Sequence, residues 1–222
     1  SAYYGAQFIG GGKNNIAYCD YTVIVGGRLN CTGGDYASVG GGRENRASVE
    51  YSTISGGKYN DVCDPNSTIG GGSNNTIQLQ CNPFLGSEQT IAPSIISGGC
   101  ANDICTNSSY MCNAIGGGHV IAGGYDNRIC AGAGFNTISG GYCNKTFGDF
   151  STIAGGRNNT TCGLWSFAIG CGNTIDSSAQ ASSAIGRSNN VCAANSVALG
   201  CGNTIAGGFA NSFAIGSGIT AG

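Results

Sequence analysis

A short sequence repeat constrains the fold of this chain more than any other feature. From Glu50 to Asn60 the chain reads Glu-Tyr-Ser-Thr-Ile-Ser-Gly-Gly-Lys-Tyr-Asn, in which one apolar residue stands just before a glycine-rich turn. We call this apolar residue the anchor residue. It recurs every 15 residues, at Ile9, Ile24, Val39, Ile54 and Ile69. A fixed period far shorter than a domain indicates one small unit stacked on copies of itself, so we expect residues 1–222 to form a single domain.

The residues around each anchor residue predict the shape of one repeat. In Ser52-Thr53-Ile54-Ser55 the polar and apolar side chains alternate, which is typical of a strand with one buried face. The glycines and asparagine that follow favour a sharp turn, and a second short strand comes after them. A perimeter of about 50 Å leaves room inside for a single file of side chains. The predicted fold class is all-β, a narrow parallel β-solenoid or β-roll with coils of about 15 residues.

Alignment of the coils reveals further columns of equivalent residues. Four residues after the anchor residue comes a basic column of Lys13, Arg28, Arg43 and Lys58. Six residues after it comes an asparagine column of Asn15, Asn30, Asn45, Asn60 and Asn75. We interpret these asparagines mainly as turn residues with positive φ, and stacked amide ladders are the alternative. An acidic and tyrosine column, Asp20-Tyr21, Asp35-Tyr36 and Glu50-Tyr51, is expected beside the basic column, paired with it between coils.

The period lengthens in the middle of the chain and then returns. Pro83 and Pro93 cannot donate to a sheet, so we predict a loop insertion at about residues 78–93. Irregular coils are expected at about residues 97–137, with Ile115 as one anchor residue. The later anchor residues are predicted to be Ile153, Ile169, Ile185, Leu199 and Ile215.

The composition disfavours several classes of function. Charged residues make up 9% of the chain and its net charge is −2, so neither nucleic acid nor an anionic membrane is an expected partner. No apolar run is long enough to span a bilayer, so we expect no membrane insertion. The single histidine, His119, most simply replaces a basic residue of the basic column. We find no catalytic pair, metal site, cofactor site or small-molecule site, and we predict that the protein is not an enzyme.

The chain is rich in cysteine, with 13 of them against one histidine. Without a regular Cys-x-x-Cys spacing, disulfides are a better interpretation than metal binding, and we expect an extracellular, oxidising location. The opening Ser-Ala-Tyr-Tyr is typical of a mature secreted chain without its signal peptide. The alternative is that the cysteines are small buried fillers. The disulfide candidates are Cys19, Cys31, Cys63, Cys81, Cys100, Cys105, Cys112, Cys130, Cys143, Cys162, Cys171, Cys192 and Cys201.

The positions of the cysteines favour bonds between chains. Equivalent residues of neighbouring coils lie about 4.8 Å apart, within reach of a disulfide, whereas two coils of separation exceed that reach. Cys63, Cys105, Cys130 and Cys162 share one column. Cys171 and Cys201 share another, with the Ile185 coil between them, so we expect them to bond to another chain and not to each other. The odd number also leaves at least one cysteine free or bonded to another molecule.

Seven asparagines begin an Asn-x-Ser/Thr sequon, the acceptor sequence for N-linked glycans. A sequence rich in these residues also produces sequons by chance. The glycosylation candidates are Asn30, Asn66, Asn74, Asn107, Asn144, Asn158 and Asn159.

The C-terminal coils resemble a known family. Asn195-Ser-Val-Ala-Leu-Gly200 and Asn211-Ser-Phe-Ala-Ile-Gly216 are similar to the head repeats of trimeric autotransporter adhesins, the YadA-like family. This resemblance covers about residues 166–222 and implies a left-handed parallel β-roll with an adhesive role. The chain departs from that family in its many cysteines. In composition and plan only, it also resembles the disulfide-linked sheath proteins of filamentous methanogenic archaea.

These observations lead to one expected function and two alternatives. We expect a structural subunit of an extracellular sheath, fibre or envelope layer, whose partner is itself and which assembles through β-sheet edges and interchain disulfides. The first alternative is a trimeric adhesin or viral fibre head that binds a receptor or matrix. The second is ice binding by an outward threonine column, which residues such as Val23 and Ala168 are expected to interrupt.

Overall fold

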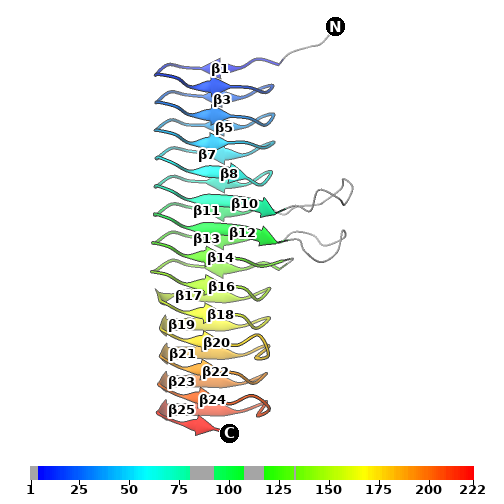
Figure 1. Cartoon of the computed structure of the whole chain (residues 1–222), viewed down its shortest axis with the longest axis vertical. Helices are drawn as coiled ribbons and strands as arrows, with labels where there is room; N and C mark the ends of the chain where they lie inside the picture. Colours follow the sequence, from blue (N-terminus) through cyan, green and yellow to red (C-terminus); the bar gives the residue numbers. More distant parts are fainter. Residues whose placement is uncertain (1–4, 81–92, 108–117, 133) are drawn as a thin grey trace.

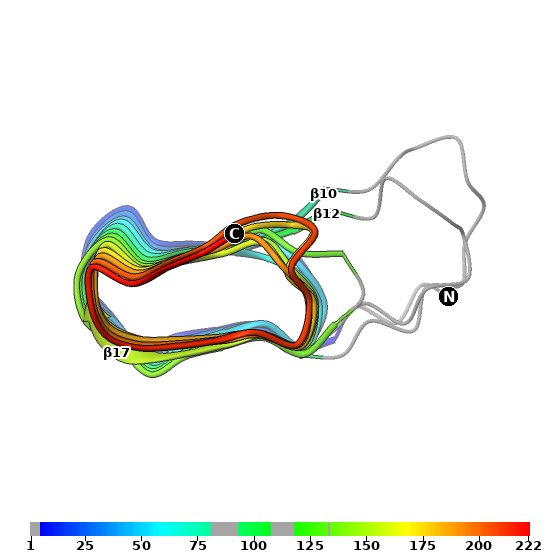
Figure 2. The ribbon, with the colours of Figure 1, turned by 90° about the horizontal axis from the view of Figure 1, so that it is seen from below.

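The computed structural model describes residues 5–80, 93–107, 118–132 and 134–222. These residues form a stack of flat coils, each of which contributes one strand to each of two parallel sheets (Figure 1). The sheets contain thirteen strands each and face one another across a narrow interior (Figure 2). The part of the chain that the structure describes contains no helix, and therefore none that could cross a membrane. The predicted all-β parallel solenoid is confirmed.

The odd-numbered strands form the first sheet. They are β1 (Phe8–Ile9), β3 (Val23–Ile24), β5 (Ser38–Val39), β7 (Thr53–Ile54), β9 (Thr68–Ile69), β11 (Ile95–Ile96), β13 (Val120–Ile121), β15 (Thr137–Ile138), β17 (Thr152–Arg157), β19 (Phe167–Cys171), β21 (Ser183–Arg187), β23 (Val197–Cys201) and β25 (Phe213–Ser217).

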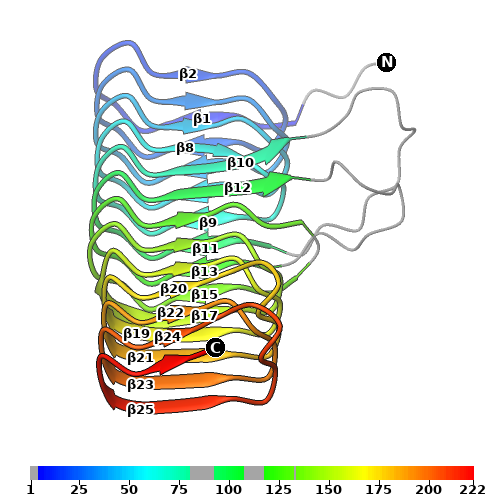
Figure 3. The same cartoon turned by 60° about the horizontal axis from the view of Figure 1, so that its bottom comes forward.

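The even-numbered strands form the second sheet, which the tilted view separates from the first (Figure 3). They are β2 (Ile16–Ala17), β4 (Cys31–Thr32), β6 (Arg46–Ala47), β8 (Asp61–Cys63), β10 (Thr76–Gln80), β12 (Asp103–Asn107), β14 (Arg128–Ile129), β16 (Lys145–Thr146), β18 (Thr160–Thr161), β20 (Thr174–Ile175), β22 (Asn190–Val191), β24 (Thr204–Ile205) and β26 (Thr220–Ala221).

Two edges join the sheets in every coil. We call the turn that leads from the first sheet to the second the glycine edge, because it carries the glycine pair. At this edge Gly57 has φ 91°, and a Cβ atom there would overlap the carbonyl oxygen of Gly72 in the next coil, so no larger residue fits. We call the turn that leads back to the first sheet the return edge. The two edges lie at opposite ends of the flattened cross-section (Figure 2).

The interior holds more than the single file of side chains that the perimeter predicts. The first sheet buries the anchor column, as at Ile54, and the second sheet buries a facing apolar column, as at Val62, both with 0% exposure. Each edge adds one inward polar residue, as Asn60 at the glycine edge and Ser52 at the return edge. Both faces and both ends of the flattened section therefore contribute inward side chains, and some coils add a fifth, as Asp64 does beside Ser67 at the return edge.

The asparagine column forms an amide ladder, and the interpretation of these residues as positive-φ turn residues is wrong. The positive φ belongs to the preceding residue, as at Tyr59 with φ 58°. Asn60 is buried, and its Nδ2 donates to Asn45 Oδ1 at 3.1 Å and to the carbonyl oxygens of Gly56 and Gly72 at 3.0 and 3.1 Å. The ladder joins successive coils and satisfies the carbonyl groups of the glycine turn.

The predicted irregular coils keep the register of their neighbours where they are described. Ile96 pairs with Ile121, so Ile121 is the anchor residue of its coil and the prediction of Ile115 is wrong. Ile115 itself lies outside the described residues. The predicted insertion at 78–93 also lies mostly outside them, although β10 continues to Gln80.

The C-terminal coils shift by one residue, which corrects the predicted anchor residues. Ile153 pairs with Ala168, but Gly156 pairs with Gly170, so the glycine edge is one residue shorter from β19 onward. A shift of one residue in a strand moves every side chain to the opposite face. The buried column therefore continues through Ala168, Ala184, Ala198 and Ala214. Ile169, Ile185, Leu199 and Ile215 point outward.

Candidate functional site

The shifted coils leave a row of aliphatic side chains on the outer face of the first sheet. We call Ile169, Ile185, Leu199 and Ile215 the apolar row; they pair in register across β19, β21, β23 and β25. Ile169 is 37% exposed, Leu199 40% and Ile215 64%. Sequence reasoning missed this surface, although the repeated Ala-Ile-Gly and Ala-Leu-Gly carry its signal: the small residue precedes the large one where the glycine pair has been shortened.

Eleven of the predicted disulfide candidates lie in the described residues, and none of the eleven is joined in a disulfide in the structure. Cys81 and Cys112 lie outside the described residues. Ten of the eleven are half-buried, and only Cys105 among them is buried. The interpretation as buried fillers therefore applies to Cys105 and not to the other described cysteines.

One pair of described cysteines lies in neighbouring coils of the same column. Ile104 pairs with Ile129, which places Cys105 next to Cys130 on the outer face of the second sheet. Burial, and then the neighbouring Cys130 thiol, raises the pKa of Cys105 to about 11. Arg128 Nε donates to Cys130 Sγ at 3.1 Å. Cys63 belongs to the same column, but Gln78 separates it from Cys105.

A second group of cysteines alternates with arginines at the glycine edge. Cys171 pairs with Arg187, and Arg187 pairs with Cys201, so a whole coil separates the two cysteines as predicted. Arg187 Nε donates to Cys201 Sγ at 3.4 Å, and Arg157 lies 3.8 Å from Cys171 Sγ. Both thiols are half-buried. This edge therefore presents two thiols that are too far apart to bond to each other, because one coil lies between them.

The remaining described cysteines lie in separate positions. Cys143 donates to Asp126 Oδ2 in the coil before it, at 3.2 Å, and Cys19 donates to the carbonyl oxygen of Gly33 at 2.8 Å. Burial raises the pKa of Cys31 and Cys162. Cys100 accepts from Ser73 Oγ at 3.3 Å. Cys192 lies beyond the end of β22, half-buried.

The charged columns lie on opposite edges, so the prediction that they stand side by side is wrong. Lys13, Arg28, Arg43 and Lys58 lie at the glycine edge, each bridged to the next coil. Asp20, Asp35 and Glu50 lie at the return edge beside stacked tyrosine rings. Within the described residues the ion pairs are Arg43–Glu44 and Arg128–Asp103, and neither links the two columns.

His119 is a core residue and not a member of the basic column. It is fully buried at the return edge, where its backbone N–H donates to Ser94 Oγ at 3.4 Å and its Nδ1 accepts from the backbone N–H of Asn136 at 3.3 Å. Burial lowers its pKa to about 4. The basic-column position of that coil is occupied by Tyr125.

Asp64 is also fully buried at the return edge. Burial raises its pKa to about 6, an effect that the hydroxyl groups of Ser67 and Ser94 partly offset. No group of three or more metal-ligating side chains that could hold an ion occurs in the described ranges.

The sequons divide into buried and exposed positions. Asn30, Asn144 and Asn159 are buried members of the amide ladder, and their Nδ2 atoms donate to neighbouring carbonyl oxygens. A glycan on these atoms would break the ladder. Asn66, Asn74 and Asn158 are exposed at turns with positive φ. Asn107 ends β12, and its side chain is outside the described part.

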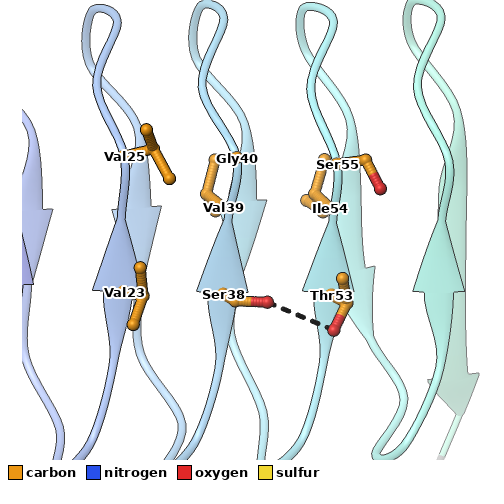
Figure 4. A pocket seen from close by; sticks show the side chains of 8 residues that line it. All are labelled: Val23, Val25, Ser38, Val39, Gly40, Thr53, Ile54 and Ser55. Atoms are coloured by element: carbon orange, nitrogen blue, oxygen red, sulfur yellow. Dashed lines mark hydrogen bonds between the residues drawn. The ribbon is translucent and has the colours of Figure 1, made fainter.

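A shallow groove crosses the outer face of the first sheet near the N-terminal coils (Figure 4). It has a volume of about 310 Å³ and is lined by Val23, Val25, Ser38, Val39, Gly40, Thr53, Ile54 and Ser55. Ser38 donates to Thr53 Oγ1 at 3.2 Å. No titratable side chain lines it. Val23 interrupts the outward threonine column here as predicted, whereas Ala168 points inward and does not belong to it.

Comparison with protein-family models and with curated protein sequences finds no match for the chain.

Proposed function

We propose that this protein is a structural subunit of an extracellular sheath, fibre or envelope layer, which associates with copies of itself and is locked by interchain disulfides. The observation that carries the proposal is the exposed apolar row on β19, β21, β23 and β25. A contiguous apolar surface on a folded protein marks an interaction site more often than a free surface.

The apolar row has the properties of a contact between copies. Burial of one aliphatic side chain stabilises by about 1.5–3 kcal/mol. Phe167, Val197 and Phe213 flank the row in one column on the same face; Phe213 is 68% exposed and the other two are half-buried. The same row on a second copy offers a complementary apolar surface at the same coil spacing.

The thiols of Cys171 and Cys201 supply the covalent part of the proposal. Neither has a cysteine at the equivalent position of a neighbouring coil: Cys171 lies between Arg157 and Arg187, and Cys201 lies between Arg187 and Ser217. With a low-molecular-weight disulfide as oxidant, one cysteine thiolate attacks that disulfide and releases one small thiol. The thiolate of a second copy then displaces the other small thiol from the mixed disulfide. Two cysteines are oxidised, one small disulfide is reduced, and the two protons leave on the small thiols.

The stacked coils suit a mechanical role. Every coil hydrogen-bonds to the next through both sheets, as from Thr53 N to Ser67 O at 3.0 Å and from Asp61 N to Asn75 O at 3.0 Å. The amide ladder adds side-chain bonds along the same axis. A force that pulls along the stack axis is therefore shared by the backbone and side-chain hydrogen bonds that join each coil to the next.

A trimeric adhesin or viral fibre head is the second candidate. The Asn-Ser-Val-Ala-Leu-Gly and Asn-Ser-Phe-Ala-Ile-Gly motifs resemble the head repeats of trimeric autotransporter adhesins, and in this chain they place alanine inside and the aliphatic residue outside. Three copies that face one another through the apolar row would cover it as fully as a larger assembly. The resemblance to archaeal sheath proteins supports the first candidate instead.

Sedimentation and electron microscopy of the purified chain, before and after reduction, test the proposal. We expect fibres, tubes or layers that withstand dilution and molar salt unless reductant is added, and I169S/L199S/I215S is expected to weaken the association. T174S/T204S, on the second sheet of the same coils, is the matched control and should assemble normally. A discrete trimer would favour the second candidate. A monomer with all thiols reduced under oxidising conditions would overturn both.

A further inference from the structure

We propose that two copies also associate side by side, with the glycine edge of one copy against the return edge of the next, through oppositely charged columns that repeat with every coil. The inference rests on the proposed self-association, but it uses a different surface. The apolar row occupies the C-terminal coils of a sheet face, whereas these columns occupy the two edges of the N-terminal coils.

The glycine edge carries the positive column. Lys13, Arg28, Arg43 and Lys58 form successive bridges, so their side chains emerge from neighbouring coils about 4.8 Å apart. All four are exposed. Glu44 pairs with Arg43 at 2.8 Å, and among the described residues no carboxylate forms an ion pair with the other three. Four of the nine cationic residues of the chain therefore lie in one column with a single counter-charge.

The return edge of the same coils carries the negative column. Asp35 and Glu50 are exposed and Asp20 is half-buried. Next to them Tyr21, Tyr36 and Tyr51 stack with ring centroids 5.1 and 4.9 Å apart.

The middle ring of the tyrosine stack, Tyr36, has a raised pKa. Partial desolvation, then Tyr51 and Tyr21, and then the charges of Asp35 and Glu50 raise the pKa of Tyr36. The return edge thus offers three carboxylates and three aromatic faces, and both groups attract cations.

The two columns match in register because they come from the same coils. Lys13 and Asp20 belong to one coil, Arg28 and Asp35 to the next, and Arg43 and Glu50 to the third. A copy displaced sideways without rotation therefore places three cations opposite three carboxylates at the same spacing. The contact is heterologous and does not close, so it continues into a flat row of solenoids.

The chain itself shows that these cations approach tyrosine rings. Arg43 Cζ lies 5.6 Å and Lys58 Nζ 5.9 Å from the centroid of Tyr59. The tyrosine stack at the return edge presents the same ring faces to a neighbouring copy. Cation–π contacts beside the ion pairs would give the contact a component that depends on the rings and not on net charge.

A negatively charged polymer is the competing occupant of the positive column. A second copy is favoured because the negative column covers the same coils, with the same period, on the opposite edge. A polymer would bind the positive column alone, and its binding would not explain why a negative column with the same period covers the same coils on the opposite edge.

Charge reversal tests the inference, with reductant present throughout so that disulfides do not contribute. K13E/R28E/R43E makes both edges negative, and D20K/D35K/E50K makes both positive. By sedimentation at low salt, each variant alone is expected to associate at least about tenfold more weakly than the unchanged chain. An equal mixture of the two is expected to associate again, because each edge then meets an opposite charge. Molar salt should weaken the association of the unchanged chain.

Matched controls separate the possible outcomes. R28E should reduce association, and K145E, which reverses one exposed cation on the second sheet, should not. Circular dichroism and the unfolding temperature confirm that each variant is folded. Normal association of both triple variants, with loss of association only in I169S/L199S/I215S, would overturn this inference and leave the proposed function intact. Loss of polyphosphate binding in K13E/R28E/R43E with unchanged self-association would identify a polymer site instead and also overturn it.

Discussion

Asn60 donates from Nδ2 to Asn45 Oδ1 in the preceding coil at 3.1 Å, and its own Oδ1 accepts from the backbone N–H and Nδ2 of Asn75 in the following coil at 3.0 and 3.1 Å. Every hydrogen-bonding group of this buried amide is therefore used. The same arrangement links the column from Asn30 to Asn189. The ladder holds the glycine turns at a fixed spacing.

N60A is expected to lower the free energy of unfolding by about 2–4 kcal/mol, because it leaves the buried backbone N–H of Asn75 without its acceptor and the carbonyl oxygen of Gly56 without its donor. Denaturant unfolding followed by circular dichroism measures the change. N74G, at an exposed turn residue with φ 55°, is the control and should change it by less than about 0.5 kcal/mol. Equal effects of the two substitutions would contradict the structural role of the ladder.

The register of the C-terminal coils predicts opposite effects for two adjacent residues. Ala198 is buried and Leu199 is 40% exposed. A198L is expected to overpack the interior and to destabilise the chain by about 1–3 kcal/mol. L199S is expected to leave the stability of the single chain unchanged and to weaken association. Thermal unfolding and sedimentation distinguish the two effects, and destabilisation by L199S instead of A198L would restore the anchor residues that the sequence predicts.

Two buried titratable groups make opposite contributions to stability between about pH 4 and pH 6. The pKa of Asp64 is raised to about 6, so the folded chain holds this proton more tightly and stability falls as the pH rises. The pKa of His119 is lowered to about 4, so the unfolded chain holds that proton more tightly and stability falls as the pH falls. The two effects, each about 3 kcal/mol, nearly cancel in the unchanged chain.

Single substitutions should uncover each effect. D64N is expected to give a chain whose stability rises from pH 4 to pH 6, and H119N one whose stability falls over the same range. Asparagine suits the histidine position because Asn136 occupies the same column in the next coil and accepts from Ser151 N at 2.7 Å. Denaturant titrations at several pH values provide the measurement; parallel curves for the two variants would be inconsistent with these assignments.

Mild oxidation with a low-molecular-weight disulfide is expected to link Cys105 to Cys130 within one chain, because they lie in neighbouring coils. Cys171 and Cys201 should not link within a chain, because Arg187 separates them. Peptide mapping by mass spectrometry identifies the bonds, and dilution separates bonds within a chain from bonds between chains. An intrachain bond from Cys171 to Cys201 would require a different register.

Expression of the chain through a eukaryotic secretory pathway tests the sequons. Glycans are expected at the exposed Asn66, Asn74 and Asn158 in the described part of the chain, and not at Asn30, Asn144 or Asn159, whose amides are buried in the ladder. Glycopeptide mapping of the folded, secreted protein gives the answer. Full occupancy at Asn144 would show that the ladder is not formed there.

The sequence predicts the solenoid well because its period reports directly on the stacking. Ile24, Val39, Ile54 and Ile69 pair as the 15-residue spacing requires. The C-terminal register could not be predicted in the same way, since alanine and isoleucine are both apolar and a strand pattern does not show which of two adjacent apolar residues faces inward. The turn that is one residue shorter from Gly170 onward decides the face, and turn geometry depends on the neighbouring coils.

The candidate sites were less predictable for a related reason. The positions of Lys13 and Asp20 in the repeat are visible in the sequence, but their separation onto opposite edges depends on a flattened cross-section with two sheets. His119 was assigned to the wrong column because its coil contains residues beyond the regular period. For the cysteines, column membership could be predicted, and one whole coil does lie between Cys171 and Cys201.

In the N-terminal coils each strand residue pairs with its equivalent 15 positions later, which has a consequence for the length of the molecule. Removal or duplication of one whole coil, for example residues 40–54, would join surfaces that already fit and would leave every remaining column continuous. A protein with this plan can become longer or shorter in whole-coil steps without a new fold, so the number of coils sets the distance that the molecule spans.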